Sequence, residues 1–173
     1  MKTITLLPVL LAVALAACAS ADVSVENRVN RAVERAATLD ARGPMRTNAG
    51  VRRIPLGLLF DDLLAFRDAL DAAKGHPELA QKAAQIHHGL TRTRRQLLQE
   101  WSSEVRVSIP MTDDEQQRFF AIVTRYAASM GRPTPYNPQP ELRALLGPLR
   151  WTSYEARRAA FFPKTVPYAL VFP

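Results

Sequence analysis

The chain has 173 residues, a formal net charge of +7 and a single cysteine. This length supports one domain with a sizeable hydrophobic core. One cysteine excludes a disulfide within the chain, so packing alone has to hold the fold together. The basic excess favours an anionic partner, and its position along the chain indicates where that partner would bind.

The chain begins with the parts of a secretory signal peptide. Lys2 gives a positive start, an apolar run extends from Ile4 to Ala17, and small residues precede Cys18. A membrane-spanning helix needs about 20 apolar residues. This run is shorter, contains Pro8 and is followed at once by polar residues. The sequence therefore predicts that residues 1–17 are a leader that is removed.

The tetrapeptide Leu15-Ala16-Ala17-Cys18 resembles the lipobox of bacterial lipoproteins. The resemblance covers residues 1–20 and implies that Cys18 becomes the first mature residue, with lipid (palmitate among the acyl chains) on its sulfur and amino group. The protein would be attached to a membrane through the lipid at Cys18. Stable anchoring takes two membrane-binding groups, and the acyl chains at Cys18 would supply more than two. Ala19, rather than aspartate, favours the outer membrane and a periplasmic domain. The alternative is a cleaved signal with an incidental cysteine.

After an anchor and spacer over residues 18–22, the rest of the chain, 23–173, is predicted to be one helical domain. Apolar residues recur at helical spacing in four long segments. Thr112-Asp113-Asp114-Glu115 fits a capping box at the start of the last of them. Residues 42–57 show no period and are predicted to be a loop, and no strands are expected. The four predicted main helices are Val23–Ala41, Leu58–Lys74, Glu78–Val105 and Thr112–Met130.

Residues 132–173 are predicted to hold two short helices and a tail. Residues 132–140 are proline-rich and extended, and a helix is expected over Glu141–Leu149. Thr152 and Glu155 fit a second capping box, which would open a helix ending at Phe162. The apolar tail, 163–173, either covers the open end of the bundle or adds to a partner's sheet edge or groove. The fold class expected is all-α: an antiparallel bundle of four main helices, one or two short C-terminal helices and an extended tail.

The sequence contains few candidates for catalysis or metal binding. His87 and His88 are adjacent, whereas a helical metal pair needs histidines four residues apart. Glu100 and Glu104 flank Trp101, but a lone carboxylate beside an aromatic is more often a helix surface. No G-x-S-x-G and no phosphate-binding glycine loop is present. We therefore expect no enzyme activity, no metal and no cofactor.

The charge is segregated along the chain. Residues 18–117 carry 14 basic and 14 acidic residues, whereas residues 118–173 carry 8 basic residues and only 2 acidic ones. Arginines recur every seven residues in this last third, so pairs of them share a helix face. They form either an ordinary solvated face or a partner surface for phosphates, anionic glycans or an acidic protein. The candidate surface residues are Arg118, Arg125, Arg143, Arg150 and Arg157.

Two functions follow as hypotheses. The first is a membrane-anchored periplasmic lipoprotein that acts as a non-enzymatic protein-interaction module, such as an envelope accessory, assembly or immunity-type subunit. The second is a binding module for an anionic envelope ligand, such as lipopolysaccharide or peptidoglycan, through the basic C-terminal third. Nucleic acid is not expected as a partner of an envelope protein.

Overall fold

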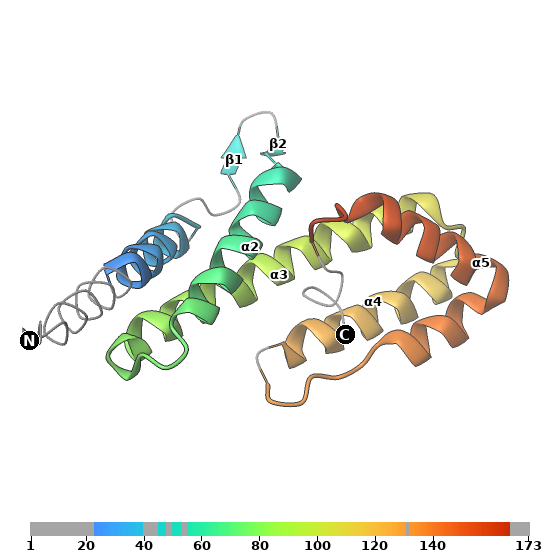
Figure 1. Cartoon of the computed structure of the whole chain (residues 1–173). Coiled ribbons are helices and arrows are strands. Elements are labelled where there is room, and N and C mark those ends of the chain that lie inside the picture. The colour runs from blue at the N-terminus through green and yellow to red at the C-terminus, as the bar shows by residue number, and fades with distance from the viewer. Residues whose placement is uncertain (1–22, 40–44, 48–49, 53–54, 131, 167–173) are drawn as a thin grey trace, which may run out of the picture.

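The computed structural model describes residues 23–39, 45–47, 50–52, 55–130 and 132–166, and it confirms the all-α fold class (Figure 1). Residues 23–39 form the N-terminal helix. The other helical elements are α2 (Leu56–Ala72), the short 3₁₀ helix η1 (Pro77–Leu79), α3 (Ala80–Ser108), α4 (Asp113–Ser129) and α5 (Gln139–Phe161).

A small hairpin precedes α2. Strands β1 (Met45–Thr47) and β2 (Gly50–Arg52) pair antiparallel, with Arg46 opposite Val51. The prediction of a strand-free loop over 42–57 was therefore wrong for these residues, and α2 also begins two residues early, at Leu56. Strands of three residues are too short to show the alternation by which a strand is recognised.

The helices pack around two hydrophobic cores that share α2 and α3. The smaller core joins the N-terminal helix to the second half of α2 and the first half of α3, and Phe66 and Ile86 are fully buried in it. The larger core joins the start of α2 and the second half of α3 to α4 and α5, around Trp101. Leu90 of α3 packs against both cores. The 29-residue α3, about 44 Å long, therefore runs through both groups of helices (Figure 1).

The predicted cap of α4 is confirmed. The backbone N–H of Glu115 donates to the Thr112 hydroxyl at 3.2 Å, and the backbone N–H of Thr112 donates to the Glu115 carboxylate at 2.9 Å. The second predicted capping box is wrong, because Thr152 lies inside α5 and its hydroxyl donates to the carbonyl of Pro148 at 3.1 Å.

The two short C-terminal helices of the prediction are the halves of α5. They meet at Gly147, which has φ 67° and ψ 174° and is followed by Pro148. Glycine adopts a positive φ without steric cost, and proline cannot donate a backbone hydrogen bond, so the break falls here rather than between Leu149 and Thr152.

The described part of the tail covers the larger core. Val166 of the tail is buried there, at 3% exposure. Just before the tail, the rings of Phe161 and Phe162 at the end of α5 contact Phe60 edge to face, with ring centroids 6.3 and 5.8 Å apart. The burial of Val166 agrees with the first interpretation of the tail as far as residue 166, and residues 167–173 lie outside the described part.

Candidate functional site

The sequence predicts a lipidation site at Cys18 and a surface of five arginines, and the structure describes only the second. Cys18 lies outside the described residues, so its lipidation stays a prediction. The five candidate arginines are all described. Within the described ranges, no helix is long and apolar enough to cross a bilayer.

Most arginines of the basic last third are ion-paired within the protein. Their acidic partners come from α3, α4 and α5, so the charge that is segregated in the sequence is partly neutralised in space. The ion pairs are Arg118–Asp114, Arg125–Glu141, Arg150–Glu115, Arg157–Glu104 and Arg158–Glu155, with N–O distances of 2.8, 2.9, 2.7, 3.7 and 3.9 Å. Arg143 is exposed and has no ion pair among the described residues.

Arg150 is a structural residue rather than a free surface charge. Its guanidinium donates to both carboxylate oxygens of Glu115, at 2.8 and 2.7 Å, and the pair is half-buried. Two hydrogen bonds in parallel give the geometry that arginine forms best with a carboxylate. The Arg150 guanidinium and the backbone N–H of Thr112 lower the pKa of Glu115 from 4.5 to about 2. Arg150 therefore holds α5 against the start of α4.

Arg125 is likewise engaged. It pairs with Glu141 of α5, and its guanidinium lies over the ring of Tyr136, 4.8 Å from the ring centroid. The Tyr136 hydroxyl donates to the same Glu141 carboxylate oxygen. A shallow groove of about 400 Å³ between α4 and α5 is lined by Arg118, Arg125 and Glu141. Because each of its charges has a partner, this groove carries little free positive charge.

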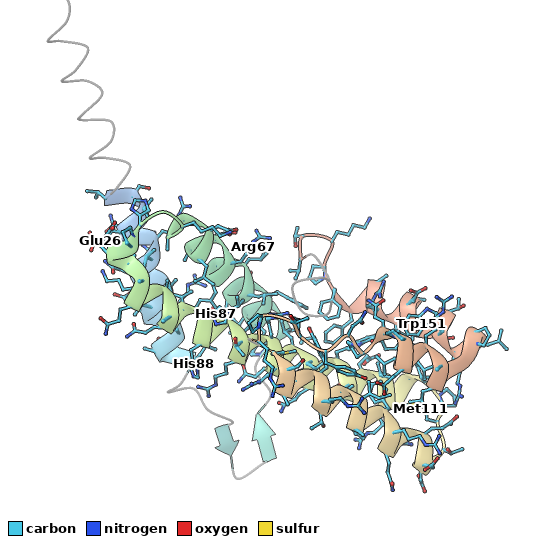
Figure 2. The ribbon with its side chains drawn as sticks, turned by 90° about the horizontal axis from the view of Figure 1, so that it is seen from below. Glu26, Arg67, His87, His88, Met111 and Trp151 are labelled. Carbon is cyan, nitrogen blue, oxygen red and sulfur yellow. The ribbon has the colours of Figure 1, made fainter. Side chains whose placement is uncertain are left out.

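The histidines do not form a site with each other. His87 and His88 are exposed on the first half of α3 (Figure 2). His76 pairs with Glu78 in the turn before α3, with 2.9 Å between Nδ1 and the carboxylate. Among the described residues, no group of three or more His, Cys, Asp or Glu side chains is placed to hold a metal ion.

A further hollow lies between the N-terminal helix and α2. It is an open groove of about 1120 Å³. One wall comes from the N-terminal helix and consists of Val23, Ser24, Asn27, Arg28, Arg31, Ala32 and Arg35. The other wall comes from α2 and consists of Ala65, Asp68, Asp71 and Ala72.

Several contacts fix the two helices that form this groove. Arg35, which lines the groove, pairs with the buried carboxylate of Asp62 of α2 at 3.3 Å. Outside the groove, Lys82 of α3 pairs with Glu26 of the N-terminal helix at 3.2 Å. Gly89 lets the N-terminal helix approach α3 closely, because a Cβ built at Gly89 would lie 2.8 Å from the Cβ of Ala36. The N-terminal helix is therefore held on the α2–α3 pair along its length.

The acidic residues of the groove have partners within the protein, whereas two of its arginines have none among the described residues. Asp68 accepts hydrogen bonds from Arg67 at 2.8 and 3.0 Å, and Asp71 accepts one from Lys74 at 2.6 Å, which lowers the pKa of Asp71. Arg28 and Arg31 are exposed and have no ion pair with any residue that the structure describes. The groove therefore presents two free guanidinium groups beside two neutralised carboxylates.

The spacing of arginines in the N-terminal helix could have indicated this groove, but the net charge of the whole segment does not show it. Arg28, Arg31 and Arg35 recur at spacings of three and four, on the edge of the apolar stripe of Val29, Ala32 and Ala36. The net charge of zero over residues 18–117 hides this local arginine stripe, because it sums acidic residues of this helix, Glu26 and Glu34, with those of other segments.

Comparisons with protein-family models, with curated proteins and with solved structures find no match to this chain. The groove, its two free arginines and the lipobox-like tetrapeptide at residues 15–18 are the features that bear on a function.

Proposed function

We propose that the protein is a lipid-anchored periplasmic lipoprotein of the bacterial envelope that acts as a non-enzymatic protein-interaction module. The lipobox ending at Cys18 supports the location. The groove between the N-terminal helix and α2 supports the interaction, and it is the docking surface in this proposal.

The observation that carries the proposal is the pair of free arginines in this groove. Arg28 and Arg31 are exposed, lie one turn apart, and line a hollow between two helices that share the smaller core. Arginine binds carboxylates through two parallel hydrogen bonds and is enriched where proteins dock. The groove is also close to the anchor in sequence, since Val23 follows Cys18 by five positions.

The alternative function, binding an anionic envelope ligand through the C-terminal third, has less support. Four of the five arginines proposed for it have an acidic partner within the protein. An anionic ligand would have to compete with these partners, and Arg150 would have to leave a half-buried pair.

Photo-crosslinking in cells tests the proposal. Benzoylphenylalanine is placed at Asn27 or Ala65, which line the groove, and at the exposed Gln99 of α3 as a matched control. We expect a discrete crosslinked protein from the groove positions and none from Gln99. The crosslink should decrease when Cys18→Ser prevents lipid attachment and leaves the precursor uncleaved, because the protein would then not reach its mature location. If the groove positions give no crosslinked protein, or if Gln99 gives the same one, the groove is not the docking surface.

A further inference from the structure

We infer that the groove between the N-terminal helix and α2 takes an acidic amphipathic helix of a partner protein, which completes a four-helix arrangement with the N-terminal helix, α2 and α3. This inference rests on the proposed function and specifies the chemistry of the partner.

The spacing of the lining residues fits a helix. Ser24, Arg28, Arg31 and Arg35 follow one another at intervals of four, three and four along the N-terminal helix. Ala65, Asp68 and Ala72 follow at intervals of three and four along α2. Alternating intervals of three and four are those at which a helix presents residues to a helical neighbour. The stripe from Ser24 to Arg35 spans about 16 Å, which is three helical turns.

The floor of the groove suits close approach of such a helix. Ala65 and Ala72 have side chains of one carbon and are half-buried, so part of their surface is open to a partner, whereas Ala32 is already packed in the smaller core. Charged residues stand at the edges. A helix in this position would bury a narrow apolar face on the alanines and place polar residues on both sides of it, as in other helix-in-groove complexes.

The unpaired charges of the groove determine whether the flanking residues of the partner helix should be acidic or basic. Asp68 and Asp71 already have Arg67 and Lys74 as partners. Arg35 has Asp62. Arg28 and Arg31 remain, so the groove has a net positive charge toward an incoming ligand. Carboxylates three or four residues apart on the partner helix would match them.

A second copy of this chain fits the groove less well. If α2 of the second copy occupied it, that helix would offer Asp68 and Asp71, which already have Arg67 and Lys74 as partners. If the N-terminal helix of the second copy occupied it, Arg28 and Arg31 would face their own counterparts, and like charges placed directly together are unfavourable. A partner helix with unpaired carboxylates matches Arg28 and Arg31 better than either arrangement.

The test uses the full chain, purified from membranes in a neutral detergent, and two synthetic peptides. The first peptide is an 18-residue amphipathic helix with an alanine and leucine face flanked by glutamates. The second has lysine at each glutamate position. Binding is measured by fluorescence anisotropy at low and moderate salt. We expect the acidic peptide to bind, with an affinity that falls as salt rises, and the basic peptide to bind about tenfold more weakly or not at all.

Charge reversal assigns this binding to the groove. Arg28→Glu combined with Arg31→Glu should weaken the acidic peptide by about tenfold and allow the basic peptide to bind. The matched control is Arg132→Glu combined with Arg143→Glu, which changes the net charge equally at exposed positions outside the groove. It should leave the affinity of the acidic peptide within about twofold. Equal losses in both double variants would overturn the inference.

Two further measurements identify a different occupant. In light scattering, a dimer that the Arg28→Glu, Arg31→Glu variant abolishes would mean that a second copy fills the groove. A fluorophore at Asn27→Cys reports on lipid when the chain is placed in phosphatidylcholine or phosphatidylglycerol vesicles. A blue shift confined to phosphatidylglycerol and lost in the same variant would mean that headgroups fill it. If the groove crosslinks a protein in cells but the acidic peptide does not bind, the proposed function stands and the acidic-helix inference fails.

Discussion

The guanidinium of Arg150 and the carboxylate of Glu115 form a bidentate ion pair that joins the middle of α5 to the capping box of α4. Arg150 also donates to the carbonyl oxygens of Pro110, Leu145 and Leu146, at 3.3, 3.2 and 2.9 Å. Glu115 therefore has two partners at once, the N-terminus of its own helix and an arginine 35 residues away.

Replacing either member of this pair should reduce stability, and the two losses should not be additive. Arg150→Gln leaves Glu115 with only its cap, and Glu115→Gln removes both the ion pair and the charged cap. In urea unfolding, both variants should have lower midpoints, and the double variant should lose less than the sum of the two single losses. Arg143→Gln, on the same helix but without an ion pair in the described residues, should stay within about 0.5 kcal/mol of wild type. Strict additivity would show that the pair does not act as a unit.

The same pair predicts a dependence on acid. The pKa of Glu115 is about 2 in the folded protein and 4.5 as a free group. Because the folded pKa is the lower one, its stabilising effect is complete above pH 4.5 and is lost as the pH falls toward 2. The stability difference between wild type and Glu115→Gln, measured by urea unfolding at a series of pH values, should therefore be constant near neutrality and narrow steadily below pH 4.5. A difference that is unchanged down to pH 2 would contradict this role.

The arginines of the last third show what sequence periodicity can and cannot predict. The sevenfold spacing correctly identifies residues on the helix surface, because Arg118, Arg125, Arg143 and Arg157 are exposed. It does not identify which of them has a partner. Glu104 and Glu115 precede the basic segment in the sequence, yet folding brings them beside Arg157 and Arg150. Net charge per segment is therefore a poor guide to net charge per surface when helices from different segments pack together.

Gly89 should be more sensitive to substitution than its place on a helix suggests. The added Cβ of Gly89→Ala would lie 2.8 Å from the Cβ of Ala36 and 3.2 Å from the ring of Phe66, and neither atom is the end of a flexible chain. Overpacking of this kind costs about 1–3 kcal/mol, whereas the gain in helix propensity is about 1 kcal/mol. We expect a net loss in thermal or urea unfolding.

Gly57→Ala in α2 provides the control for this substitution, because a Cβ there meets no atom within 4 Å. It should be neutral or slightly stabilising. If Gly89→Ala were equally harmless, the N-terminal helix would not lie as close to α3 as the structure places it, and the groove beside it would be less firmly held.

The anchor prediction is independent of the fold. Cys18→Ser should prevent incorporation of labelled palmitate and leave the precursor uncleaved before residue 18, because the lipobox resemblance makes the thiol the site of lipid attachment. The measurement is metabolic labelling followed by membrane fractionation. Identical labelling and fractionation of the two proteins would mean that Cys18 is incidental and that the leader is processed by another route.

Much of the helical framework follows from local sequence, whereas the arrangement of the helices does not. Apolar stripes and the Thr112 capping box predict α2, α3 and α4 to within a few residues. Thr152 and Glu155 have the same spacing as that box, but the helix is interrupted earlier, at Gly147 and Pro148. A new helix has therefore already begun before Thr152 and continues past it. The groove depends on which faces of the N-terminal helix and α2 remain uncovered, and this is a property of three helices together.

Both hydrophobic cores include residues of α2 and α3, so we expect the two cores to unfold together in a single transition. Both tryptophans, Trp101 and Trp151, lie in the larger core, so their fluorescence reports that core, while far-ultraviolet circular dichroism reports all helices. Wild-type curves from the two probes should coincide. Leu90→Ala removes a side chain that packs on both cores and should cost about 1–3 kcal/mol while separating the two curves. Leu63→Ala, confined to the larger core, should lower stability without separating them. Wild-type curves that already differ would mean that α3 does not transmit stability from the larger core to the helices that form the groove.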